Sequence, residues 1–279
     1  MDAAQPASPL CDAHLHLQDE AYARDRAAVI RAATDAGVRR FVVNATCQAD
    51  WQEVLDLAAI HQGMTACLGL HPWFVGRATI DWPRQLEDLL RENPSAGIGE
   101  IGLDQWIEPR DEKAQARAFV IQLDLADRFG RPVMIHCLRA WGWLMKILRS
   151  RPAPPPAGML IHACGASEEL IDELAEMGAY FSVAGDTFES KRKRKQRAAA
   201  HIPAERLLIE TDAPDMLPAE HLDPVSWTDP AGRQRNVPAN LPAICRALAE
   251  LRQTSPPQLA ETCWANARRF LGPLLEAEE

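Results

Sequence analysis

Eight short apolar runs recur along the chain at a nearly constant spacing, and this period constrains the fold more than any other feature. Each run ends in a polar or small residue. One residue at or next to each end serves as a marker, and successive markers are separated by 23 residues (His162 to Gly185) to 36 residues (Glu100 to His136). That interval holds one strand, one helix and two loops. The runs are 10–16, 41–45, 67–71, 97–102, 133–137, 159–162, 180–184 and 207–212. The sequence therefore predicts eight consecutive strand–helix units.

The segments between the runs carry helical signals. Phe119, Leu123 and Ala126 are spaced by four and three residues in segment 112–129, which is the period of one helix face. Ser167 precedes two glutamates and is a good residue to begin a helix. Because crossovers between parallel strands are right-handed, eight such units close most naturally into a (β/α)8 TIM barrel of the α/β class.

An open doubly wound sheet is the alternative fold. It would carry a glycine-rich turn after the first strand, but residues 17–20 are Leu-Gln-Asp-Glu. We therefore expect a single barrel domain at 9–272, with a flexible N-terminus at 1–8 and a tail at 273–279. Segment 213–238 follows the last strand without helical period, which predicts a long loop that forms a rim or partial lid.

The charge and the apolar pattern restrict location and partners. The formal net charge of −9 disfavours binding of a polyanion unless metal ions or a local basic surface, such as run 191–197, attract it. No apolar run of about 18 residues exists, so no membrane partner is expected. The seven cysteines form no Cys-x-x-Cys pair, and the first residues lack a secretion signal. These features predict a cytoplasmic protein with reduced thiols.

A His-x-His pair lies in the first run. Side chains two residues apart on a strand point to the same face, so His14 and His16 would project together, about 7 Å apart along the strand. This spacing suits two ligands of one metal ion. Incidental occurrence is the alternative for such a short motif, and the rest of the chain must decide.

Metal-ligand residues fall at the ends of most runs. Five of the eight histidines, together with Glu100 and Asp212, take this position. In a barrel, all these ends lie on the face where active sites form. Unpaired buried charges would cost several kcal/mol each, a penalty that metal ions remove. These histidines and carboxylates offer more donor atoms than one tetrahedral ion needs, which favours two divalent ions per chain. The candidate ions are zinc, manganese and magnesium.

Motifs along the whole chain resemble one family. They occupy 12–16 (DAHLH), 69–73 (GLHPW), 99–104 (GEIGLD), 132–137 (PVMIHC), 161–162 (IH), 207–214 (LLIETDAP), 235–238 (RNVP) and 266–270 (NARRF). In this order they resemble the TatD-type metal-dependent deoxyribonucleases of the amidohydrolase superfamily, over about residues 9–272.

The resemblance implies a binuclear metal site with six ligands. The first two histidines would bind one ion, the last two the second ion, the glutamate would bridge both, and the aspartate would lie near the first ion. Asp212 would also orient and deprotonate the attacking water, which makes it the expected catalytic residue. The six expected ligands are His14, His16, Glu100, His136, His162 and Asp212.

Further residues are expected near the substrate. His71 and Asp104 lie on the same predicted rim, and Arg235 is a third candidate contact. Glu210, two residues before the catalytic aspartate on the same inward face, is expected to support the ligands from behind.

One position departs from the family pattern. The family has an arginine two residues after the fifth-strand histidine, where this chain has Leu138. Arg139 is therefore the candidate for a displaced phosphate contact. Trp73, Trp106 and Trp227 fall on predicted loops at the rim, where stacking on bases and ordinary packing are the two interpretations.

The leading functional hypothesis is a metal-dependent hydrolase of phosphodiester bonds, with DNA as substrate. The alternative is a hydrolase that uses the same metals on carboxylic esters, lactones or aminoacyl-tRNA esters. A binding protein without catalysis is disfavoured, because it would not need the full ligand set.

Overall fold

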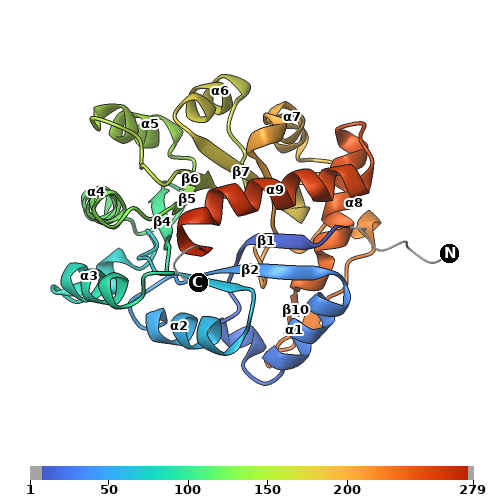
Figure 1. Ribbon diagram of the computed structural model, residues 1–279, viewed down its shortest axis with the longest axis horizontal. Coiled ribbons are helices and arrows are strands. Elements are labelled where there is room, and N and C mark those ends of the chain that lie inside the picture. Colours follow the sequence, from blue (N-terminus) through green and yellow to red (C-terminus); the bar gives the residue numbers. More distant parts are fainter. Residues whose placement is uncertain (1–7, 276–279) are drawn as a thin grey trace. The chain divides into compact units, whose positions relative to one another are not determined.

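The computed structural model describes residues 8–275, which alternate between strands and helices (Figure 1). Every predicted run overlaps a strand. The eight strands are β1 (Leu10–Leu15), β2 (Val38–Asn44), β3 (Met64–Cys67), β4 (Ile98–Asp104), β5 (Val133–Leu138), β6 (Met159–Ile161), β7 (Ala179–Val183) and β8 (Leu207–Ile209).

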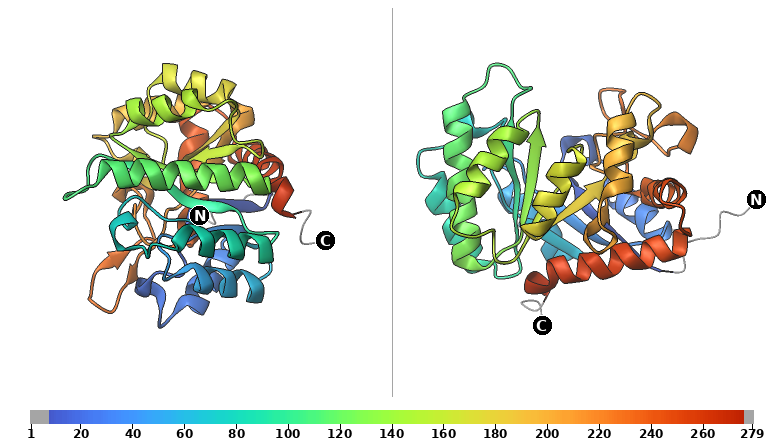
Figure 2. Two further views of the ribbon diagram at one scale, coloured as in Figure 1. Left: turned by 90° about the vertical axis from the view of Figure 1, so that its left-hand side faces the viewer. Right: turned by 90° about the horizontal axis from the view of Figure 1, so that it is seen from above.

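Helices follow the strands as predicted. They are α1 (Arg26–Asp35), α2 (Trp51–Ile60), α3 (Trp82–Glu92), α4 (Glu112–Phe129), α5 (Trp141–Ser150), α6 (Glu168–Glu176), α7 (Lys193–His201), α8 (Leu241–Leu251) and α9 (Pro256–Leu275). The predicted bounds of 112–129 are those of α4, the long green helix in Figure 2, and α6 begins directly after Ser167.

The third predicted strand was placed too late in the sequence. Strand β3 covers Met64–Cys67, whereas the apolar run suggested 67–71. The chain stays close to β4 beyond β3, but irregularly: the Leu68 amide donates to Gly97 (3.0 Å) and the Gly99 amide donates to Leu68 (3.1 Å). A side chain at Gly69 would lie 2.7 Å from the backbone of Gly99. This close approach breaks the regular ladder.

One compact unit comprises residues 43–162, 177–180 and 270–275 of the described chain. Its strands β4, β5 and β6 pair in parallel, with Gly102 opposite His136 and Ile135 opposite Ile161. Helix α4 packs against β4, α5 packs against β4 and β5, and α2 packs against β3. Because helices cover the strands, β4 is buried along its whole length.

The other unit comprises residues 8–42, 163–176 and 181–269 of the described chain. Strands β7 and β8 pair in parallel, with Val183 opposite Ile209. The amide of Asp212 donates to the His14 carbonyl (3.0 Å), and the His16 amide donates to the Ala213 carbonyl (2.8 Å). These bonds join the end of β1 to the segment that follows β8.

The segment after β8 contains no α-helix, as its lack of helical period predicted, but it does contain short regular elements. Within residues 213–238 these are a 3₁₀ turn (Glu220–Leu222) and an antiparallel pair, β9 (Trp227–Thr228) and β10 (Gln234–Arg235) (Figure 1). The short strands escape periodicity analysis because each has only two residues.

The predicted ends of the domain are only partly described. Residues 1–7 of the predicted flexible N-terminus and 276–279 of the predicted tail lie outside the described residues. Helix α9 continues to Leu275, so residues 273–275 are helical, and Leu274 is buried. No helix within residues 8–275 is long and apolar enough to cross a membrane.

Gly102 makes the close pairing of β4 and β5 possible. Its φ is +148°, and a methyl group there would overlap the carbonyl oxygen of His136. We expect Gly102→Ala to lower the free energy of unfolding by about 3 kcal/mol or more, because the backbone cannot move aside without breaking the ladder. Urea denaturation measures this. Gly142→Ala, in open space on α5, is the matched control and should be neutral or stabilising. Equal stability of both variants would contradict the close packing.

Candidate metal centre

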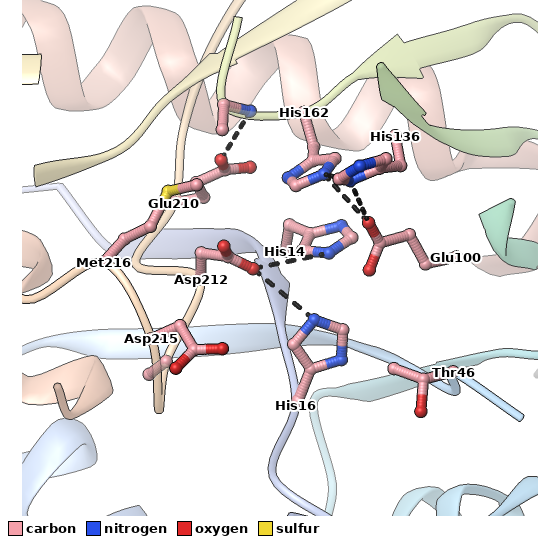
Figure 3. Close-up of polar contacts among 12 residues, drawn as sticks. His14, His16, Thr46, Glu100, His136, His162, Glu210, Asp212, Asp215 and Met216 are labelled. Carbon is pink, nitrogen blue, oxygen red and sulfur yellow. Dashed lines mark hydrogen bonds and ion pairs between the residues drawn. The ribbon is translucent and has the colours of Figure 1, made fainter. Parts of the chain in front are cut away.

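The unit that contains β1 and β8 holds three of the predicted ligands, called here the Asp212 cluster: His14, His16 and Asp212. The Nε2 atoms of His14 and His16 lie 3.6 Å and 3.4 Å from the same Asp212 oxygen, Oδ1 (Figure 3). The two imidazole rings meet edge to face, with centroids 5.1 Å apart. The alternation of side chains along β1 therefore brings the His-x-His pair together, as the sequence predicted.

Asp12 supports this cluster and was missed by the sequence reasoning. It is fully buried and accepts hydrogen bonds from the Thr211 amide (2.9 Å) and the Thr211 hydroxyl (2.5 Å). Burial raises the pKa of the Asp12 carboxyl to about 8, although the Thr211 bonds oppose the change. The pair fixes the residue directly before Asp212. The sequence did hold a signal for Asp12. It lies two residues before His14, and residues two apart on a strand lie on the same face.

Glu210 contacts the backbone beside a predicted ligand. It is fully buried, and its Oε1 accepts a hydrogen bond from the amide of Ala163 (2.7 Å), the residue after His162. Its other oxygen accepts from the Ser182 hydroxyl. Glu210 thus connects β8 with β7 and with the segment that follows β6. We infer that Glu210 supports the predicted ligands from behind, the role that its place two residues before Asp212 suggested.

The other unit holds the Glu100 cluster, defined as His71, Glu100, His136 and His162. The carboxylate oxygen Oε1 of Glu100 lies 2.9 Å from His162 Nε2, 3.0 Å from His136 Nδ1 and 3.4 Å from His71 Nε2. Figure 3 shows the first two of these contacts. The Glu100 carboxylate is buried and faces three imidazoles. Its negative charge therefore needs positive charge close by to compensate for the loss of water.

His71 belongs to this cluster, but its hydrogen bonds differ from those of a ligand. Its Nδ1 accepts a hydrogen bond from the Trp73 amide (3.2 Å). A neutral imidazole has one donor and one acceptor nitrogen, so the proton lies on Nε2, which faces Glu100. We infer that His71 donates to Glu100 and positions it. This is a different role from the substrate contact expected on the rim.

Asp104 is buried beneath His136 and has no exposed surface. Its Oδ2 lies 2.9 Å from His136 Nε2 and accepts from the Trp73 indole (2.7 Å), while its Oδ1 accepts from the amide of Trp106 (2.6 Å). Burial would raise the pKa of the carboxyl, but these hydrogen bonds outweigh it and hold the pKa below its usual range. With Nε2 of His136 bonded to Asp104, Nδ1 is left to bind a metal.

Asp104→Asn tests this carboxylate–histidine pair. Asparagine keeps the shape but loses the charge, and we expect metal affinity or activity to fall by about 10- to 100-fold. Titration of the metal-free protein with Mn²⁺ measures the affinity. Asp111→Asn is the control, because this exposed aspartate begins α4 away from the cluster. Unchanged metal affinity in Asp104→Asn would contradict the orienting role.

The two arginines expected near the substrate lie in different surroundings. Arg139 is exposed and follows β5 in a left-handed conformation (φ +58°). Arg235, in β10, contacts Asp229 (3.0 Å) and Asp215 (3.3 Å). Arg235 is therefore held near the segment that follows Asp212.

Both clusters have the donor chemistry of a divalent metal site. In the Asp212 cluster, one donor atom from each of the three residues lies within 4.8 Å of the others. The same holds for His71, Glu100 and His136 in the Glu100 cluster, of which Glu100 and His136 are the expected ligands. Mixed imidazole and carboxylate donors are typical ligands of zinc and other first-row ions. The residues present therefore fit divalent metals.

A fold of strand–helix units with buried histidine and carboxylate clusters defines a class of metal-dependent hydrolases, and comparison with known proteins identifies the family. The TatD related DNase family matches residues 11–272. The chain belongs to this family. It is 31% identical to the 3′-5′ ssDNA/RNA exonuclease TatD of Escherichia coli K12, over 94% of this chain and 98% of that protein. The corresponding protein of Erwinia tasmaniensis is 34% identical, over 93% and 98% of the two chains.

Solved structures confirm the predicted fold class. The crystal structure of YJJV, a TatD homologue from Escherichia coli K12, is similar with a TM-score of 0.84 and 27% sequence identity. The likeness covers 94% of this chain and 97% of that structure. The prediction of an α/β fold of the (β/α)8-barrel type, and of a TatD-type hydrolase, is thereby confirmed.

Proposed function

We propose that this chain is a metal-dependent exonuclease that removes nucleotides from the 3′ end of single-stranded DNA or RNA. The observation that carries the proposal is the arrangement of the family motifs into two clusters of metal-type donors. Relatives with this named activity share 31% to 34% of their residues with nearly the whole chain. The proposal narrows the hypothesis of a deoxyribonuclease to one polarity and widens it to RNA.

The proposed ligands are the six implied by the family resemblance. His14, His16 and Asp212 would hold one ion, and His136 and His162 the other, with Glu100 assigned to both. When bound, divalent ions lower the pKa of a water and stabilise negative charge on the scissile phosphate. Zinc, manganese and magnesium are the candidate ions.

The residues of this chain position the reaction and move its proton. Asp212 accepts the proton of the attacking water, because its carboxylate lies among the donor atoms of its cluster. Asp104 keeps the His136 ring in one orientation and one tautomer, and His71 holds the Glu100 carboxylate in position. Arg235 and Arg139 are the proposed phosphate contacts.

The remaining assignments follow from the same proposal. The partner would be a nucleic-acid strand, residues 9–272 would form the hydrolase domain, and the place of action would be the cytoplasm. The net charge of −9 favours contact with one strand end over wrapping of a long duplex.

Cleavage of end-labelled oligonucleotides tests the proposal. A single-stranded 20-mer labelled at the 5′ end should give a ladder that shortens from the 3′ end, and the same strand labelled at its 3′ end should release only mononucleotide. A parallel panel of carboxylic esters and lactones should remain intact. Ester or lactone turnover without oligonucleotide cleavage would replace this proposal with the alternative hydrolase function.

A further inference from the structure

Two exposed tryptophans meet beside the Glu100 cluster. Trp73 is 42% exposed and Trp106 is 52% exposed, although large aromatic side chains usually bury most of their surface. Their ring centroids lie 6.4 Å apart, with a tilt of 35°. The Trp73 ring also lies 6.5 Å from the ring of His136 and 5.2 Å from that of His71. An apolar aromatic surface thus borders residues of the metal-type cluster.

Asp104 holds this surface in place. Its carboxylate accepts the indole N–H of Trp73 (2.7 Å) and the backbone N–H of Trp106 (2.6 Å). The same carboxylate contacts His136 Nε2 (2.9 Å). One buried group therefore fixes both tryptophans and a predicted ligand. The Trp73 indole and the Trp106 backbone are fixed in this way, which reduces the conformational entropy lost when a flat ligand stacks there.

A third exposed apolar residue is joined through its backbone to the segment that holds Trp106. Leu138, at the end of β5, is 38% exposed, and its carbonyl accepts the amide of Gln105 (2.9 Å), the residue before Trp106. This is the position at which the family resemblance implies an arginine. The chain therefore has an exposed leucine where the family pattern places a cation, and the nearby indole faces suit a neutral flat group.

We propose that Trp73 and Trp106 form a stacking platform for an unpaired base of the nucleic-acid substrate. The inference rests on the proposed function and deepens it. Nucleobases present flat faces that stack on indole rings irrespective of sequence. A base within a duplex is paired and stacked on both sides, so the platform favours single-stranded ends. The platform selects the form of the substrate, while the metal-type residues carry out the cleavage.

Trp106→Ala is the most specific variant for this test. The substitution removes the exposed ring but keeps the backbone N–H that donates to Asp104, whereas changing Trp73 would also break the indole bond to that carboxylate. We expect kcat/KM on a single-stranded oligonucleotide to fall about 10-fold or more, the range typical of one lost base stack. Trp106→Phe should retain most of the activity. Ile80→Ala, a fully exposed apolar residue of the same unit, should change nothing.

Substrates with one missing base show whether the ring acts by stacking. An abasic residue is placed in turn at each of the last four positions of the 3′ end. At one position, the missing base should lower the kcat/KM of the wild type by about the same factor as Trp106→Ala lowers it on a normal strand. At that position, the missing base should cause no further loss in Trp106→Ala. If the two factors multiply in full at all four positions, the inference is overturned.

Binding without turnover separates this inference from the proposed function. Fluorescence anisotropy measures the affinity of labelled single strand for Asp212→Asn, with and without Trp106→Ala. The platform is supported if the double variant binds a normal strand more weakly than Asp212→Asn does, while both proteins bind equally to the strand that is abasic at the sensitive position. This support holds even if the wild type proves not to be an exonuclease. Equal binding of both proteins to every strand contradicts it.

Discussion

Replacing Asp212 with asparagine is expected to lower kcat on single-stranded DNA by about 10²- to 10⁴-fold, the range attributed to a general base. Its carboxylate lies 3.4 Å and 3.6 Å from two predicted ligands, in the position to accept the proton of a water held there. Asparagine is isosteric but far less basic. Steady-state kinetics with a labelled oligonucleotide and saturating Mn²⁺ measures the loss.

The backbone conformation of Asp212 makes asparagine a more informative substitution than alanine. Asp212 has a φ of +54°, in the left-handed region that asparagine and aspartate tolerate better than most residues. Asn therefore removes the charge without adding strain, which Ala would do. Asp223→Asn is the matched control, because this exposed aspartate has a φ of +50°. Near-normal turnover by Asp212→Asn, fully loaded with metal, would refute its role as base.

Glu100→Gln should remove metal binding as well as turnover. The Oε1 atom of Glu100 faces three imidazole nitrogens within 3.4 Å, and it is the only carboxylate in the Glu100 cluster as defined. In the glutamine variant, an uncharged amide replaces the negative carboxylate as the group offered to the metal. We expect at least a 100-fold loss of activity, since even residues behind the ligands contribute about 10- to 100-fold.

Metal content distinguishes this loss from a loss of the base. Elemental analysis after dialysis should find fewer ions per chain in Glu100→Gln than in Asp212→Asn, because Glu100 is assigned to both ions and Asp212 to one. Glu92→Gln, on the exposed end of α3, removes the same charge away from the cluster and should behave as wild type. Normal metal content with normal activity in Glu100→Gln would contradict the assigned ligand.

The strand ends were accessible from sequence because they combine two strong signals. Buried parallel strands appear as apolar runs, and metal-ligand residues at their ends interrupt those runs. His14, His16 and Asp212 come together as expected because strand alternation and parallel pairing follow simple rules. Strand β3 was misplaced because the residues near Gly69 are apolar and buried without forming a regular ladder.

The supporting residues could not be predicted in the same way. Asp104 looks like a rim residue in the sequence, yet its environment depends on Trp73 and His136, which lie 31 and 32 positions away. A hydrogen-bond network between distant segments leaves no period in the sequence. The tautomer of His71 likewise depends on a backbone amide and not on any motif. The residue types were visible, but their partners required the structure.

Restoring the metal-free protein with measured amounts of Mn²⁺ tests the central claim most directly. The account predicts that the chelated protein neither cleaves a single-stranded oligonucleotide nor loses its fold by circular dichroism. Activity should then rise with added metal until two ions are bound per chain and not increase further, and Asp212→Asn loaded at saturating Mn²⁺ should not cleave. Cleavage that survives complete removal of divalent ions would contradict the account.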